Sequence, residues 1–135
     1  HFADFITAIK KHLTDESVEV FLNVRTDTYL LGIPDAREET QKRIERFDAA
    51  GADGIFVPCV QQEEDIQALV AASGIPVNVM CMPELPDFST LRTLGVKRIS
   101  MGNFLFDTMY SHLEQRLGSV MEHQSFASVF SHAHY

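Results

Sequence analysis

Polar residues near the ends of otherwise apolar segments could together bind a small anion. They are Arg25, Asn78 and Ser100, with Asn23 close to the first of them. A guanidinium holds a carboxylate or phosphonate through two parallel hydrogen bonds, and amides and a hydroxyl add neutral donors. Two alternatives stay open, because Arg25 could pair with Asp27 only to shape a loop, and a buried asparagine is often satisfied by backbone groups. The residue types therefore predict an anion site, with Arg25 as its first candidate.

Other reactive side chains are weaker candidates. Cys59 and Cys81 each follow an apolar run, but neither has a histidine nearby in sequence that could activate it as a nucleophile. His132 and His134 form a His-x-His pair without a third metal ligand. We therefore assign no catalytic role to these cysteines and no metal role to these histidines.

The elements that must position the candidates follow from the spacing of apolar residues. Residues 18–27 alternate, so Val20, Leu22 and Val24 face one way while Asn23 and Arg25 face the other. Further strands are predicted at 54–58, 76–80 and 96–101. Helical spacing predicts helices at 1–13, 36–50, 63–72, 88–94 and 105–117, with Asp35 and Asp87 as N-terminal caps and Gly51, Gly95 and Gly118 as terminators.

Four strand–helix units with short connections predict an α/β fold with a parallel sheet and right-handed crossovers. Four such units are half of an eight-stranded β/α barrel, but they could also form a small doubly wound sheet. In either fold, ligands bind at the C-terminal ends of the strands, which is where Arg25 stands.

Composition limits the class of protein. The chain has 135 residues, 45% of them hydrophobic, which is enough for one globular domain. A formal net charge of −8 argues against binding to nucleic acid or to an anionic membrane. No apolar run approaches the ~18 residues of a membrane span, and two cysteines are too few for a disulfide framework. We expect a soluble, cytoplasmic protein, and a start without methionine indicates a piece of a longer chain or a processed terminus.

Four segments in this order resemble the C-terminal half of the isocitrate lyase and phosphoenolpyruvate mutase superfamily over residues 5–118: FLNVRTD, RIERFDAAGADGIFVP, IPVNVM and LGVKRISMGN. The resemblance implies the C-terminal half of a TIM-type (β/α)8 barrel, with four parallel strands that correspond to strands five to eight. On this basis we assign residues 1–118 to the half-barrel. Residues 119–135 become a helical tail that is expected to pack on a neighbouring subunit.

The resemblance also implies an activity. Members of this superfamily are magnesium-dependent lyases and mutases that cleave or rearrange a C–C or C–P bond next to a 2-oxo acid through an enolate. Arg25 matches the family's substrate-binding arginine, and Asn78 and Ser100 remain pocket candidates. The Mg²⁺ ligands and the catalytic cysteine loop of the family belong to the N-terminal half, so neither role is moved onto this chain. A homo-oligomer with exchanged C-terminal helices is also implied.

Two positions depart from the family pattern. Pro58 stands at the position where the resembled lyases have glutamate and the resembled mutase has histidine. Met80 stands where the lyases have asparagine, although Asn78 lies two residues earlier on the same face. Because proline cannot act as acid, base or donor, we expect a separate branch of the family. The alternative is a catalytically inactive half-barrel or degenerate relative that acts through association.

Overall fold

The computed structural model describes residues 2–131. The chain divides into two compact units, with the division between Ser100 and Met101. The sequence predicts a boundary after residue 118 instead. The two units are therefore described separately, and packing of the tail on a neighbouring subunit stays a prediction.

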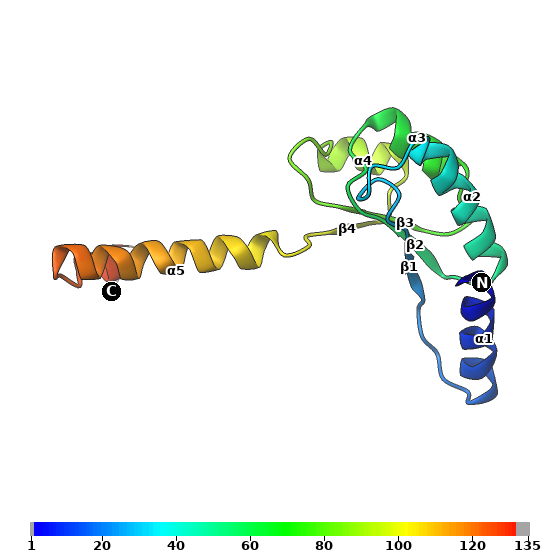
Figure 1. Ribbon diagram of the computed structural model, residues 1–135, viewed down its shortest axis with the longest axis horizontal. Coiled ribbons are helices and arrows are strands. Elements are labelled where there is room, and N and C mark those ends of the chain that lie inside the picture. Colours follow the sequence, from blue (N-terminus) through cyan, green and yellow to red (C-terminus); the bar gives the residue numbers. More distant parts are fainter. Residues whose placement is uncertain (1, 132–135) are drawn as a thin grey trace. The chain divides into compact units, whose positions relative to one another are not determined.

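The first unit contains one parallel sheet whose strands lie in sequence order, β1-β2-β3-β4. The strands are β1 (Asn23–Arg25), β2 (Gly54–Val57), β3 (Val77–Met80) and β4 (Arg98–Ser100). The helices are α1 (Phe2–Asp15), α2 (Ala36–Ala49), α3 (Glu63–Ala71) and α4 (Phe88–Leu94). Figure 1 shows α2, α3 and α4 on one face of the sheet. Strands that alternate with helices in this way confirm the predicted α/β class.

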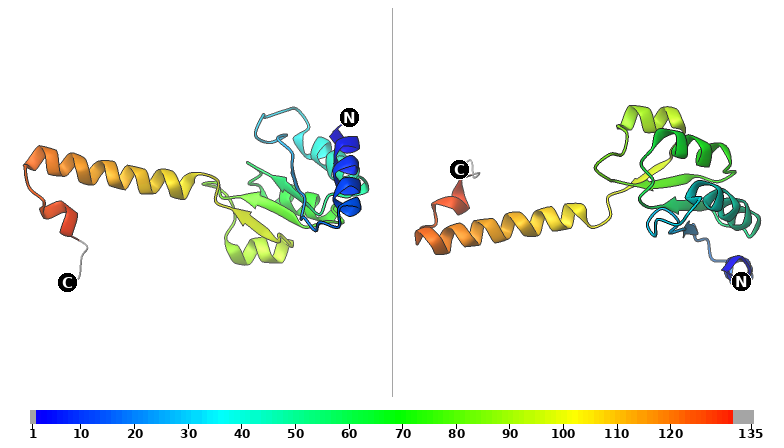
Figure 2. Two further views of the ribbon diagram at one scale, coloured as in Figure 1. Left: turned by 90° about the horizontal axis from the view of Figure 1, so that it is seen from below. Right: turned by 45° about the horizontal axis from the view of Figure 1, so that its top comes forward.

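The core lies between this face of the sheet and the helices. Its strand residues are buried and alternate along each strand, and its helix residues follow the apolar stripes that the sequence predicts. They are Val24, Ile55, Val57, Val77 and Val79 from the strands, and Ile44, Phe47, Ile66, Leu69 and Leu91 from the helices. Figure 2 shows α1 beside α2. The ring centroids of Phe2 on α1 and Phe47 on α2 are 5.4 Å apart. The opposite face of the sheet carries both polar and apolar side chains.

Three of the predicted helix signals are confirmed, and the predicted cap at Asp35 is wrong. Asp87 caps α4 by accepting a hydrogen bond of 2.8 Å from the Thr90 backbone N–H. Gly51 and Gly95 follow α2 and α4 with φ of 96° and 92°, a left-handed conformation that favours glycine. Asp35 does not cap α2 through its side chain, because its own φ is 54° whereas a capping residue has an extended backbone.

Strand β1 is shorter than the predicted strand at 18–27. It spans Asn23–Arg25, and it pairs only with β2 because it lies at one edge of the sheet. The side chains of Val18, Val20 and Phe21 are 46–63% exposed. The prediction that this segment is a buried strand is therefore wrong for residues 18–21. Among the described residues, no neighbouring strand pairs with them.

The second unit contains α5 (Phe104–His123) and α6 (Ala127–Phe130). The prediction that the helix ends at Gly118 is wrong, because α5 continues to His123 and Gln124 follows it with φ of 48°. Within α5 no residue is buried, although many are apolar. No helix in residues 2–131 is both long and apolar enough to cross a membrane. His132 and His134, weighed above as metal ligands, lie outside the described residues.

Candidate active site

The register of the sheet places the candidate residues on the face opposite the helices, here called the inward face. Arg25 aligns with Phe56, Phe56 with Asn78, and Asn78 with Arg98, so these residues form one row across the strands. Aligned residues of parallel strands point to the same side. Ser100 lies one row nearer the C-terminal ends of the strands, next to Met80. The alternation in the sequence therefore predicted that Arg25, Asn78 and Ser100 share a face. It did not predict which residues align across the strands.

Arg25 ends β1 with half of its side chain exposed, at 51%. Its Nε donates to Oδ1 of Asp27 at 2.5 Å, and its Cζ lies 5.9 Å from the centroid of the Phe56 ring. The ion pair between Arg25 and Asp27, which the sequence left open as an alternative, is therefore present. It engages Nε, however, and the contacts within residues 2–131 leave the two terminal nitrogens available. A bidentate contact to an anion needs two such nitrogens. The ion pair therefore orients the guanidinium and leaves its terminal nitrogens able to bind an anion.

The segment after β1 is fixed to α2 by buried threonines that sequence analysis did not single out. The hydroxyls of Thr28 and Thr40 lie 2.5 Å apart, and both residues are fully buried. Arg43 donates from Nη1 to the hydroxyl of Thr26 at 3.3 Å. The sequence signal that could have indicated these contacts is the alternation of Thr26 and Thr28 directly after the strand. Because these contacts flank Asp27, they hold the residue that orients Arg25.

A second contact joins α2 to α3. Arg37 on α2 donates from Nε to Oδ1 of Asp65 on α3 at 2.5 Å. Burial and the nearby Asp65 carboxylate raise the pKa of Tyr29 well above its usual value. Tyr29 therefore keeps its proton at neutral pH, and it offers a hydroxyl rather than a charge beside the C-terminal end of β1.

Asn78 lies in the middle of the sheet and is 2% exposed. Within the described part of the chain, neither its Oδ1 nor its Nδ2 has a hydrogen-bond partner. A buried polar group left in this state costs about 1–3 kcal/mol. Within residues 2–131, no backbone group satisfies the Asn78 side chain. The three site predictions share a face, but Arg25 and Asn78 are separated by two strand spacings, about 10 Å.

The cysteines and the proline lie at the C-terminal ends of the strands. Pro58 is buried directly after β2, and Cys59 follows it with φ of 65°. Cys59 and Cys81 are free thiols and are partly buried. Among residues 2–131, no three His, Cys, Asp or Glu side chains gather where they could hold a metal ion. The described residues therefore do not form a metal site by themselves.

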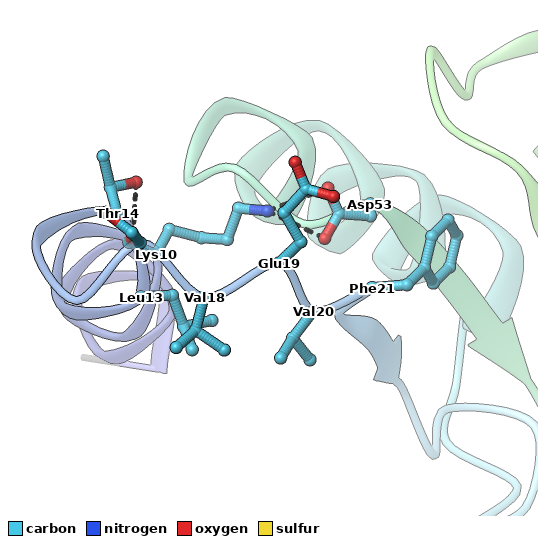
Figure 3. A pocket seen from close by; sticks show the side chains of 9 residues that line it. Lys10, Leu13, Thr14, Val18, Glu19, Val20, Phe21 and Asp53 are labelled. Carbon is cyan, nitrogen blue, oxygen red and sulfur yellow. Dashed lines mark hydrogen bonds and ion pairs between the residues drawn. The ribbon is translucent and has the colours of Figure 1, made fainter.

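A cavity of about 600 Å³ lies at the other end of β1. It is lined by α1 and by the segment that leads into β1, and Figure 3 shows Lys10 reaching Asp53 along its wall. In parallel α/β folds, substrates bind at the C-terminal ends of strands rather than at the end where this cavity opens. The cavity is therefore not the candidate site.

The ion pair in this cavity predicts a dependence of stability on pH. Asp53 accepts from Lys10 Nζ at 2.8 Å and from the Leu22 N–H at 2.7 Å. Burial opposes ionisation, but these bonds lower the pKa of Asp53 overall. Its contribution is therefore fully present above the unfolded-state pKa of about 3.9 and is lost as pH falls through the lower folded-state value.

We expect Asp53→Asn to lower the free energy of unfolding more at neutral pH than near pH ~2, where the aspartate is itself protonated. Urea unfolding of both proteins between pH ~2 and ~6 measures this difference. A difference that stays constant over this range would contradict the assignment. Asp15→Asn is the matched control, because its pair with Lys11 lies on the exposed face of α1.

Comparison with known proteins identifies the family of the chain. Residues 1–121 match the family model of phosphoenolpyruvate phosphomutase. The chain belongs to this family. An uncharacterized protein of Mycobacterium tuberculosis is 38% identical over 98 residues, which are 73% of this chain and 36% of that protein. The oxaloacetate decarboxylase of Paraburkholderia xenovorans is 36% identical over 81 residues, 59% of this chain and 27% of that enzyme.

A solved structure that is similar to this chain shows the same fold. The crystal structure of a phosphonomutase-like protein from Burkholderia cenocepacia superposes with a TM-score of 0.78 at 34% identity. The match covers 87% of this chain and 50% of that protein. The chain thus spans about a third of its curated relatives and half of this structure. Its four β/α units are the C-terminal half of a β/α barrel, as predicted.

Proposed function

We propose that this chain is the C-terminal half of a barrel enzyme that cleaves or rearranges a C–C or C–P bond next to a 2-oxo acid through an enolate. The family match and an oxaloacetate decarboxylase among the relatives support this reaction class. The observation that carries the proposal is Arg25, a half-exposed guanidinium oriented by Asp27 at the C-terminal end of β1.

Arg25 binds the anionic group of the substrate in this proposal. Its terminal nitrogens donate two hydrogen bonds to a carboxylate or phosphonate, which fixes the substrate over the C-terminal ends of the strands. The positive charge also stabilises the negative charge that develops as the enolate forms. Asn78 and Ser100 are secondary substrate-binding residues, since both lie on the same inward face.

The proposed enzyme uses Mg²⁺, but the described residues of this chain do not provide its ligands. A bound Mg²⁺ would supply a Lewis acid for the enolate oxygen. Because the described residues form no cluster of metal ligands, we assign those ligands to the other half of the barrel. We also propose a cytoplasmic location, consistent with two free thiols. Replacement of Arg25 in the full-length enzyme, with turnover of oxaloacetate and phosphonopyruvate as the measurement, tests the reaction class.

A second candidate function is association without catalysis. One edge of β1 and one edge of β4 have no partner strand among the described residues. Along α5, apolar side chains more than half exposed recur at helical spacing, namely Leu105, Phe106, Met109, Tyr110, Leu113, Leu117 and Met121. Exposed apolar surface of this kind marks association sites. We propose that a second copy of the chain covers this face by exchange of C-terminal helices, whether or not the protein is catalytic.

We expect light scattering to find an assembly of at least two chains. Leu113→Lys together with Leu117→Lys should shift the assembly to the monomer, because two charges replace apolar contacts in the interface. Gln115→Lys is the matched control, since residue 115 lies on the opposite side of α5 from residue 113 and is already polar. A monomeric parent protein would contradict the proposed exchange.

A further inference from the structure

The two cysteines of the chain fall at the same level of the sheet, at the C-terminal ends of its central strands. Strands β2 and β3 pair as far as Val57 and Val79. Cys59 and Cys81 each stand two residues beyond this last pair. The register of the strands therefore brings together two thiols that are far apart in the sequence.

The loops that carry the cysteines stay close to each other beyond the strands. The Glu84 backbone N–H donates to Oε1 of Gln61 at 3.0 Å, which joins the loop after β3 to the loop after β2. The Cys81 N–H donates to the Ser100 carbonyl at 2.7 Å, which holds Cys81 in line with β3. Neighbouring strands lie about 4.8 Å apart. This spacing suits a disulfide, whose Cα atoms are usually about 4.4–6.8 Å apart.

The backbone at Cys59 is one that glycine would adopt more easily. Cys59 has φ of 65°, in the left-handed region that is strained for a residue with a Cβ. Its neighbours Pro58 and Val60 are fully buried, whereas Cys59 itself is only partly buried. The core therefore does not depend on the Cys59 side chain for its packing. What a cysteine adds at this strained position is its thiol.

We propose that Cys59 and Cys81 form a reversible disulfide by exchange with a low-molecular-weight disulfide such as oxidised glutathione. The thiolate of one cysteine attacks the small disulfide, forms a mixed disulfide and releases one small thiol. The thiolate of the other cysteine then attacks the mixed disulfide and releases the second.

The exchange balances in atoms and electrons. The sulfur–sulfur bond of the small disulfide breaks, and the one between Cys59 and Cys81 forms. The protein loses two electrons, which reduce the small disulfide, and the two protons of its thiols end on the released small thiols. Both cysteines are partly exposed, so a small disulfide can reach them. An excess of reduced thiol reverses the exchange and restores the free thiols that the structure shows.

Mass spectrometry of the full-length protein tests the disulfide. The protein is equilibrated with defined ratios of reduced to oxidised glutathione, quenched with acid, labelled with N-ethylmaleimide and digested with trypsin. Trypsin cleaves after Arg46 and Arg92 and finds no lysine or arginine between them, so both cysteines stay in one peptide. We expect oxidation to make this peptide lighter by two hydrogen atoms and to block both maleimide additions. Dithiothreitol should restore both.

Variants and unfolding separate a bridge held by the fold from general reactivity of thiols. In the parent protein, the bridged peptide should exceed the glutathione adduct at least about ten-fold, because the second thiol is held beside the first. Cys81→Ser and Cys59→Gly should each accumulate the glutathione adduct instead. Cys59→Gly suits the φ of 65° and should keep the fold. Unfolding in urea should lower the ratio of bridge to adduct in the parent at least about ten-fold.

Three results would overturn the disulfide: two glutathione adducts on the parent peptide, two maleimide labels at every glutathione ratio, or a bridge that forms equally well in urea. The disulfide does not depend on the proposed reaction. Arg25→Ala should lower turnover of the full-length enzyme and leave formation of the bridge unchanged. The two proposals therefore fail or succeed separately.

Discussion

Arg25→Ala in the full-length enzyme is expected to lower kcat/KM by about 10²–10³-fold, the usual cost of removing a group that stabilises developing negative charge. The substrate anion loses its bidentate contact, and the enolate loses a nearby positive charge. The fold should survive, because the side chain is 51% exposed and an exposed ion pair contributes little to stability. Steady-state kinetics and circular dichroism measure the two effects.

Two further variants separate the charge of Arg25 from its orientation. Arg25→Lys keeps the charge but loses the planar fork, so we expect kcat/KM to stay well below that of the parent. Asp27→Asn keeps the fork but weakens the contact that orients Nε. We expect a smaller loss for Asp27→Asn than for Arg25→Ala. Unchanged turnover of Arg25→Ala would remove the proposed role and, with it, the assignment of the site.

Ile55→Ala is expected to lower the free energy of unfolding by about 2–5 kcal/mol, the range for truncating a large aliphatic side chain in a core. Ile55 is fully buried on β2 and aligns with Val24 on one side and Val77 on the other. Three carbons removed there leave a cavity between the sheet and the helices. Because β2 is a central strand, the neighbouring backbones cannot easily collapse into that space.

Urea unfolding of the full-length protein measures this loss. Phe88→Ala is the matched control, because it removes a larger apolar side chain that is 75% exposed. We expect its free energy of unfolding to change by no more than about 0.5 kcal/mol. Equal effects of the two substitutions would show that the face between the sheet and the helices is not the core.

Pro58 bears on which reaction the enzyme catalyses. It is buried at the end of β2 and offers neither a backbone N–H nor a titratable side chain. At this position the lyases that this sequence resembles have glutamate, and the mutase has histidine. In the proposed enzyme, a proton acceptor or donor must therefore come from another position. Tyr29 keeps its proton at neutral pH because burial and Asp65 raise its pKa, and so it is not a ready base.

The sequence by itself determined the α/β class, the order of the elements and the residues that share a face. Period-two alternation put Arg25, Asn78 and Ser100 on one side of the strands, and the register agrees. Gly95 and Asp87 marked the limits of α4 correctly. These features are local, since they depend on the backbone conformation of a few consecutive residues.

Only the tertiary structure decided which polar residues are neighbours and where the elements end. Arg98 lies two residues before Ser100, so alternation could have placed it on the inward face, but its row with Asn78 depends on the pairing of β3 with β4. Strand β1 is short because a strand extends only as far as a partner pairs with it. Gly118 does not end α5, because one glycine inside a helix costs only about 1 kcal/mol. Pairing and packing join residues far apart in the chain, and for that reason local patterns could not fix them.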